Sequence, residues 1–284
     1  MKEALIFLAG IFFLAPSFSQ KRTVDKEPRD MVFCPAGSFT ATREMNGELR
    51  DISVSVDAFW ISNEISNQEF REFYDDILGH PDDTLSYLDI KEFAKSRNAG
   101  DSDKKIKDFL IRKPYSEIAG ELFDKNKWNP YEADPTGSKY FFNKKYNDYP
   151  VVGVTYEGAK YYCTWRTNKE NAALKAKGKA PGFDYRLPVE MEWAYALDYA
   201  KEEKGPDEIL AVTRGKANEL GMYHMSDNVS EWVINKAQSR NGDIMQIVMG
   251  DSWKKSSQNQ RQLVEPGTAS ETIGFRMVKS YGGK

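Results

Sequence analysis

The chain has 284 residues, of which 40% are hydrophobic and 29% charged, a composition typical of a folded globular protein with a sizeable core. Forty basic and 43 acidic residues leave a formal net charge of −3, so no strong field of one sign favours nucleic acid as a partner. The length fits one large domain or two small ones.

The N-terminal segment has the features of a targeting signal. A lysine precedes an apolar run at residues 4–14, and small residues follow this run. The run is shorter than the roughly 20 apolar residues that a membrane span needs. We therefore predict a cleaved signal peptide over residues 1–19 and a flexible charged leader over 20–30, with an uncleaved anchor as the alternative. No cysteine lies near the cleavage point, which gives no support for a lipid anchor.

The mature chain would enter an oxidising compartment with two cysteines, Cys34 and Cys163. An even number of cysteines in such a compartment permits one disulfide. Two buried free thiols are the alternative, because a small apolar cysteine is common in protein cores.

Strands and a capped helix are predicted near the start of the mature chain. Residues 31–40 have strand character followed by a Pro-Ala-Gly turn. Apolar and polar residues alternate over 52–56, which predicts a half-buried strand running into 59–61. Ser66 can cap the helix that follows, with Glu69 at capping-box spacing.

A long connection, residues 78–147, comes next. It has weak helical patches at 103–111 and 115–123, and then an aromatic stretch. One interpretation is a solvated insertion that packs locally on the core, and the other is an interaction surface. The aromatic residues of such a surface would be Trp128, Tyr131, Tyr140, Phe141, Phe142, Tyr146 and Tyr149.

Two further helices and two apolar strands complete the chain. Thr155 is placed as the N-cap of one helix. Pro188 suits the first position of the next, and Glu190 and Glu192 suit the positive end of its dipole. Apolar strands are predicted at 244–249 and close to the C-terminus.

Several of these segments, in the same order, resemble motifs of the formylglycine-generating-enzyme-like (sulfatase-modifying factor) family. The most specific is RLPVEMEWAYAL, and the signature GMYHMSDNVSEW occupies residues 221–232; others are MVFCPAGSF, VSVDAFWISNEISN, PVVGVT, YCTW and IGFR. The resemblance covers about residues 31–279. It implies an α+β, C-type-lectin-like fold with short strands and much irregular structure. The domain would span residues 31–280, with an insertion at 78–147.

The resemblance also bears on catalysis. Enzymes of this family oxidise a substrate cysteine to formylglycine with two cysteines that bind copper as thiolates, because a soft ion needs soft sulfur ligands. The matching region here, GDSWKKSSQNQRQ, contains no sulfur, and an ungapped match puts Lys255 and Gln260 at the two cysteine positions. The expectation is therefore a chain that is not an enzyme, with no catalytic residues and no copper.

Calcium is a separate question. Family members bind Ca²⁺ within the signature, and the matching positions are His224, Asp227, Val229 and Glu231. Because Ca²⁺ prefers oxygen ligands, His224 is a poor replacement for the usual group, whereas Asp227 offers a new oxygen. Calcium at these positions is one expectation. The alternative is that Asn228 and Glu231 only brace the loop by hydrogen bonds.

The resemblance gives one expectation for the cysteines. In secreted family members the cysteine of the Y-C-x-W motif can pair with a cysteine after G-F-R, where this chain has Met277. The first and last strands of lectin-like folds lie side by side, which makes a Cys34–Cys163 disulfide the expected replacement.

Residues 139–165 are most similar to gliding-motility proteins of the GldK and GldJ type, which are envelope components of Bacteroidota gliding and type IX secretion. This implies a non-catalytic structural or interaction component of a cell-envelope machine. It would be periplasmic or held at the outer membrane by partner envelope proteins, with no anchor of its own. The expected surface combines residues 128–149 with the loop 251–261. The alternative is a secreted lectin-like binding module for peptide or glycan, and an active sulfatase-modifying oxidase ranks last.

Overall fold

The computed structural model describes residues 28–45, 48–88, 94–95, 100, 106–123, 139–200, 208–254 and 261–282. Its helices are α1 (Asn67–Gly79), α3 (Tyr115–Ala119), α4 (Tyr156–Ala176) and α5 (Glu190–Ala200), with 3₁₀ turns at Ile106–Phe109 and Lys144–Tyr146. Its strands are β1 (Met31–Cys34), β2 (Gly37–Met45), β3 (Glu48–Val56), β4 (Phe59–Glu64), β5 (Thr84–Leu88), β6 (Leu110–Pro114), β7 (Tyr185–Arg186), β8 (Ser230–Gln238), β9 (Ile244–Met249), β10 (Arg261–Val264), β11 (Ile273–Gly274) and β12 (Arg276–Ser280).

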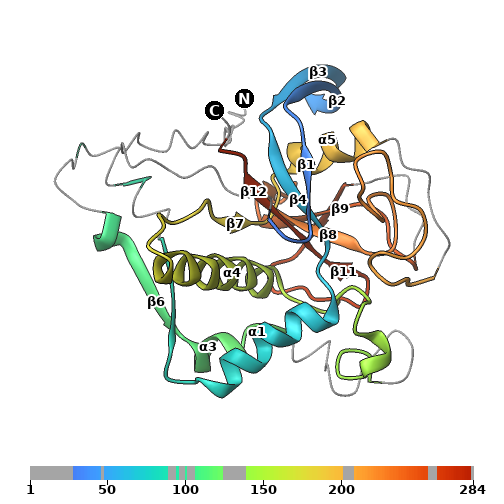
Figure 1. Ribbon diagram of the computed structural model, residues 1–284. Helices are drawn as coiled ribbons and strands as arrows, with labels where there is room; N and C mark the ends of the chain where they lie inside the picture. The colour runs from blue at the N-terminus through green and yellow to red at the C-terminus, as the bar shows by residue number, and fades with distance from the viewer. Residues whose placement is uncertain are drawn as a thin grey trace.

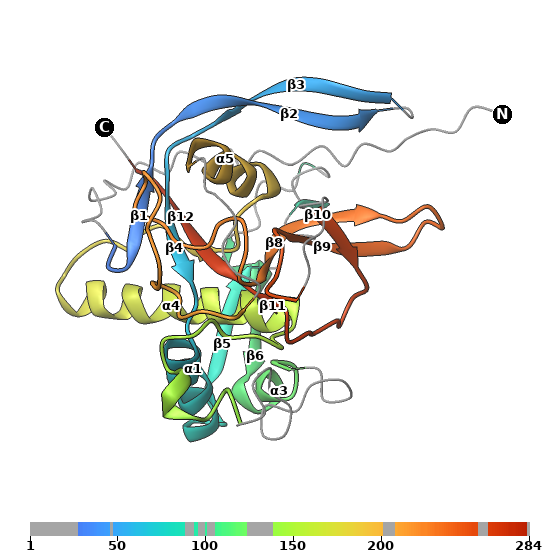
Figure 2. The same cartoon turned by 90° about the vertical axis from the view of Figure 1, so that its right-hand side faces the viewer.

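A four-stranded antiparallel sheet, in the order β1-β4-β12-β7, separates two helices (Figures 1 and 2). Lys279 of β12 points toward α4, where its ammonium group donates to both carboxylate oxygens of Glu170 at 3.0 and 2.9 Å. The neighbouring Val278 lies on the opposite face, in the same buried cluster as Trp193 of α5. The sheet therefore has α4 on one face and α5 on the other, and the β2–β3 hairpin extends over α5 (Figure 2).

A second sheet, in the order β10-β9-β8-β11, carries the end of the signature. Its strands are antiparallel except for β11, which runs parallel to β8. Gly274 of β11 sits where a Cβ atom would lie 2.7 Å from the Val151 carbonyl oxygen, so a larger residue would separate this strand from its neighbours. The predicted α+β fold of short strands and long irregular connections is confirmed.

The helix caps follow the sequence prediction at two of the three sites. Ser66 and Glu69 form the expected capping box at α1, and the Thr155 hydroxyl accepts from the Gly158 amide at 2.9 Å. The α5 helix begins at Glu190 rather than at Pro188, which corrects the third prediction. Val189 takes the N-cap position instead, since its carbonyl oxygen accepts the Trp193 amide at 3.1 Å and its own amide donates to Glu192 at 2.8 Å.

The described part of the long connection is integrated into the core. Residues 106–109 form a 3₁₀ turn and 110–114 a strand paired with β5, which corrects the helix predicted at 103–111. The predicted patch at 115–123 contains only the short α3. Leu85, Ile118 and Leu122 are fully buried in the cluster that also packs against α4.

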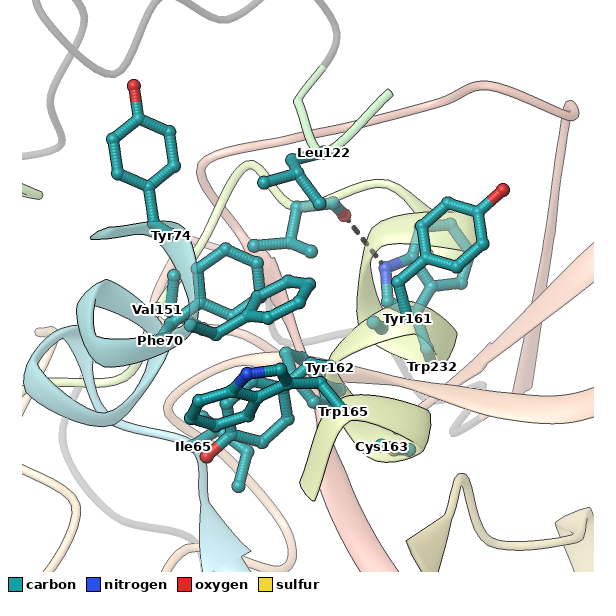
Figure 3. Packing of buried hydrophobic residues seen from close by; sticks show 14 of the residues in the cluster. Ile65, Phe70, Tyr74, Leu122, Val151, Tyr161, Tyr162, Cys163, Trp165 and Trp232 are labelled. Carbon is teal, nitrogen blue, oxygen red and sulfur yellow. Dashed lines mark hydrogen bonds between the residues drawn. The ribbon is translucent and has the colours of Figure 1, made fainter. Parts of the chain in front are cut away.

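The aromatic stretch is core rather than surface, which corrects the predicted interaction residues. Tyr140 and Phe141 are 0% and 1% exposed, Tyr146 is buried, and Phe142 and Tyr149 are partly buried against the same cluster. Lysines and asparagines between these rings give the sequence the look of a surface. The rings instead cover the apolar face of α1, where Phe70 packs among other aromatic side chains (Figure 3). Trp128 and Tyr131 lie outside the described residues.

Candidate functional site

The signature segment is a loop that crosses from α5 toward β8 in an unusual backbone conformation. Gly221, His224 and Asn228 have φ angles of 88°, 56° and 62°, in the left-handed region. Asn228 can adopt this conformation because its short polar side chain forms hydrogen bonds on both its oxygen and its nitrogen. The side-chain Oδ1 atom accepts the Leu210 amide at 2.8 Å, and the side-chain Nδ2 atom donates to Glu64 at 2.8 Å.

A buried ion pair lies at the centre of the site. Glu231 is 1% exposed and Arg276 is 0% exposed. The arginine Nε donates to Oε2 of Glu231 at 2.6 Å, and its Nη2 donates to Oε1 at 2.7 Å. The Trp193 indole N–H also donates to Oε2, at 2.7 Å. Both oxygens of the signature glutamate are thus occupied by donors from α5 and β12.

Arg276 joins β12 to two other parts of the fold through its remaining N–H groups. It donates to the carbonyl oxygens of Ser62, Tyr223 and His224 at 3.0, 3.2 and 3.3 Å. These oxygens belong to β4 and to the signature loop. The guanidinium therefore fixes the loop against the central sheet, a role that suits arginine because it presents several donors in one plane.

A second buried carboxylate, Glu64, lies opposite Arg276 in the pairing of β4 with β12. Burial raises the pKa of the Glu64 carboxyl to about 8, and the nearby negative charge of Glu231 acts in the same direction. His224, Arg276 and Asn228 act against this increase in the pKa. Within the described part of the chain, the Oε1 atom of Glu64 has no hydrogen-bond partner. Glu231 is therefore the carboxylate that pairs with Arg276, and Glu64 keeps its proton up to about pH 8.

The structure brings together the residues predicted to bind calcium, but not as an open set of oxygen ligands. The Nδ1 atom of His224 lies 3.1 Å from the Oδ1 atom of Asp227, and both side chains are buried. Glu231 is already bound by Arg276 and Trp193. Among the described residues, no group of three or more His, Cys, Asp or Glu side chains is placed to hold a metal ion. This geometry does not fit a resident calcium ion at these positions.

The described residues of the loop 251–261, which was predicted to present an interaction surface, are largely buried or hydrogen-bonded to the core. Asp251 and Ser252 are buried, and the Trp253 amide donates to the Asn228 carbonyl oxygen at 2.8 Å. Arg261 donates to Glu190 at 2.8 Å. Lys255 and Gln260, the residues at the two expected cysteine positions, lie outside the described residues.

Both cysteines are free and buried, which corrects the expected disulfide. Cys34 belongs to the cluster on the α5 face of the central sheet, whereas Cys163 projects from α4 on the other face (Figure 3). The expectation failed because the central sheet lies between the two side chains, and because β4 separates β1 from β12, which therefore do not lie side by side. Burial raises the pKa of the Cys34 thiol to about 12 and also raises that of Cys163.

The three residues that complete the ion-pair network, Glu64, Trp193 and Arg276, were not singled out in the sequence. Each lies inside a motif of the family, within SNEISN, MEWAYAL and IGFR. That these three residues surround Glu231 becomes evident only when β4, α5 and β12 are packed together. For Glu64 and Arg276 the signal is a charged residue beside apolar ones, because a buried charge requires a partner. Trp193 carries no charge and gives no such signal.

The fold and the motifs place the chain in a known class of protein domain. Residues 17–205 and 197–281 match the model of the sulfatase-modifying factor enzyme 1-like domain, so the chain belongs to the formylglycine-generating-enzyme-like sulfatase-modifying factor family. The inactive C-alpha-formylglycine-generating enzyme 2 of Bos taurus is similar, with 25% identity over 304 residues and 89% of each chain covered. The Mus musculus protein of the same name is 25% identical over 289 residues, covering 89% of this chain and 86% of its own.

Two solved structures share the fold. The structure of PvdO from Pseudomonas aeruginosa has a TM-score of 0.53 with 19% identity, covering 91% of this chain and 98% of that one. The crystal structure of CarF has a TM-score of 0.51 with 17% identity, covering 89% of this chain and 98% of that one. At these identities the similarity establishes the fold alone.

Proposed function

We propose that this chain is a non-catalytic member of the family that acts as a structural or interaction component of a bacterial cell-envelope machine for gliding motility or type IX secretion. The observation that carries the non-catalytic part is the lack of sulfur in residues 250–262, where an ungapped match puts Lys255 and Gln260 at the two cysteine positions. The pairing of Glu231 with Arg276 and Trp193 makes the signature a brace between the two sheets. The two mammalian relatives carry the word inactive in their names, which supports the same conclusion.

The positions of the two cysteines support the proposal that the chain does not oxidise cysteine to formylglycine. A copper site of two thiolates needs both sulfur atoms close together and deprotonated. Cys34 and Cys163 lie on opposite faces of the central sheet, and burial raises the pKa of both thiols. They are therefore poorly suited to replace the cysteine pair whose positions Lys255 and Gln260 occupy.

The envelope role rests on the sequence. Residues 139–165 resemble gliding-motility proteins, and residues 1–19 have the pattern of an export signal, so we place the mature chain in the periplasm or at the outer membrane. In the described part of the chain, no helix has the length and apolar character of a membrane span.

Affinity purification of the tagged chain from native membranes tests this role. We expect a defined set of envelope proteins to co-elute, and we expect a deletion strain to lose gliding or secretion. A chain that elutes alone, with gliding and secretion intact in the deletion strain, would contradict the proposal. A strain that expresses an unrelated exported protein with the same tag is the control.

A secreted binding module for peptide or glycan remains the second candidate, and an exposed aromatic cluster favours it. The rings of Phe33 and Tyr281 are 4.9 Å apart, and that of Trp60 is 5.2 Å from Phe33. Phe33 is 37% and Tyr281 42% exposed at the edge of the central sheet. Specific binding on a glycan array, abolished by Phe33→Ala, would favour this candidate over the first.

A further inference from the structure

A hollow with a volume of about 630 Å³ opens between α1, α3 and α4. These helices lie on the opposite side of the central sheet from α5 (Figure 2). It is lined by Glu72, Asp76, Tyr115, Trp165, Asn168 and Lys169. None of these residues belongs to the signature or to the ion-pair network around Arg276. The volume lies in the range of protein ligand sites and greatly exceeds that of one amino or guanidino group.

The floor of the hollow is a tryptophan held by an aspartate. Trp165 and Tyr162 project from α4 toward α1 (Figure 3). The Trp165 indole N–H donates to the Oδ2 atom of Asp76 at 2.7 Å. This bond fixes the ring, and it places a carboxylate at the ring edge. An aromatic face beside a carboxylate is a favourable environment for a cation.

The side chain of Lys169 places its ammonium group in this environment. The ammonium group of Lys169 lies 4.4 Å from the centre of the Trp165 ring and 3.9 Å from the Oε2 atom of Glu72. The Lys169 and Glu72 side chains are 57% and 56% exposed, so a lysine held by such contacts is easily displaced. The Trp165 ring and Glu72 thus form a site for a cation, and the Lys169 ammonium group occupies this site only weakly.

The charge around the hollow is negative. Glu72 and Asp76 line it, and Asp83 lies close enough that both aspartates raise the pKa of the Tyr115 hydroxyl, after burial. Lys169 is the one lysine or arginine among the lining residues, and the His80 ring is a second basic group, with its Nδ1 atom 3.1 Å from Oδ1 of Asp76. A second cation entering the hollow would therefore be attracted rather than repelled.

We propose that this hollow binds a lysine or arginine side chain of a partner protein, which takes the place of the Lys169 ammonium over Trp165 and beside Glu72. The inference deepens the proposed interaction role and rests on it for the origin of the partner. The binding itself is measured on the purified chain, so its failure would leave co-purification of envelope proteins unaffected.

The test is a titration of the full mature chain with short blocked peptides, GGKGG and GGRGG, followed by ¹⁹F spectra of 5-fluorotryptophan-labelled protein. The chain has 6 tryptophans, and a Trp165→Phe variant identifies the Trp165 signal. We expect both basic peptides to shift this signal in a saturable way, and the matched peptide GGEGG to leave it unchanged. Spermidine included as a free amine distinguishes a side chain in a peptide from a small polyamine.

Three variants make the result specific. Lys169→Met removes the internal occupant, and we expect it to bind the basic peptides about fivefold more tightly. Glu72→Gln with Asp76→Asn keeps an acceptor for the Trp165 indole and removes two charges, and we expect about a fivefold loss or more. The signals of the other tryptophans report whether each variant is folded, and Glu72→Gln alone serves if the double variant is not.

Glu157→Gln is the matched control, because Glu157 also pairs with a lysine of α4, Lys160, which itself lies 5.2 Å from the centre of the Tyr156 ring. Glu157, Lys160 and Tyr156 do not line the hollow between α1, α3 and α4, so we expect peptide binding to stay as in the wild type. Three results would overturn the proposal. They are no saturable shift of the Trp165 signal, an equal loss in Glu157→Gln, and stronger binding of spermidine than of either basic peptide.

Discussion

Arg276 and Glu231 hold each other in the interior through two short hydrogen bonds, Nε to Oε2 at 2.6 Å and Nη2 to Oε1 at 2.7 Å. The pair joins β12 of the central sheet to β8 of the second sheet. It uses the glutamate that the family signature supplies. The most recognisable segment of the chain thus acts as a structural brace.

Removal of the guanidinium should be costly. Arg276→Met leaves Glu231 charged and buried without its main partner, and we expect a loss of about 3–5 kcal/mol in the free energy of unfolding. Urea unfolding measures this loss. Arg261→Met is the control, because Arg261 is partly exposed and its pair with Glu190 should contribute about 1 kcal/mol or less. Equal losses in the two variants would contradict the brace.

The pH dependence of stability should reveal Glu64. Its pKa in the folded chain is about 8, above the ordinary value of 4.5, so the folded state keeps a proton that the unfolded chain loses between these values. Stability from this group is therefore complete below about pH 4.5 and is lost as the pH rises through 8, by at most about 1.4 kcal/mol per pH unit. Glu64→Gln should flatten the dependence of the unfolding free energy between pH 5 and 8. The same slope in both proteins would contradict the assignment.

The aromatic stretch gives a test of core against surface. Phe141 is 1% exposed and packs against Phe70 and Phe123, so Phe141→Ala should cost about 3–5 kcal/mol. Lys144→Ala, at an exposed position in the same stretch, should change stability by less than about 0.5 kcal/mol. Thermal or urea unfolding compares the two. A Phe141→Ala protein of wild-type stability would restore the stretch as a candidate docking surface.

The two thiols should be present and protected. We expect a thiol reagent to find two free thiols in denatured, unreduced protein, as the burial of Cys34 and Cys163 in separate clusters requires. The same reagent should react slowly with the folded chain, because burial both covers the sulfur atoms and raises their pKa values. Absence of free thiols in the denatured protein would show that a disulfide forms.

The sequence predicted those elements whose signals are local. The capping box at Ser66, the cap at Thr155 and the alternation over 52–56 all depend on neighbours in the chain, and the structure has them. The family motifs predicted the α+β fold because each marks one packed element. Local signals are insufficient where partners are distant in the chain, as with Cys34 and Cys163, which the central sheet separates.

The candidate site was predicted in position but not in chemistry. The signature marked the correct loop, yet the Arg276–Glu231 pair spans 45 residues and Asn228, which donates to Glu64, is 164 residues away from it in the chain. Side chains that neutralise a potential ligand cannot be recognised until the strands are paired. The same limit explains the aromatic stretch, since burial of Tyr140 and Phe141 depends on where α1 lies.

The central claim is that the signature persists as a brace in a chain without the reaction of its family. The most direct measurement incubates the purified chain, supplied with copper and oxygen, with a cysteine-containing sulfatase peptide, and follows conversion of the cysteine to formylglycine by mass spectrometry. An active enzyme of the family is the positive control. We predict that the peptide keeps its cysteine under conditions in which the control converts it. Formation of formylglycine by this chain would contradict the claim.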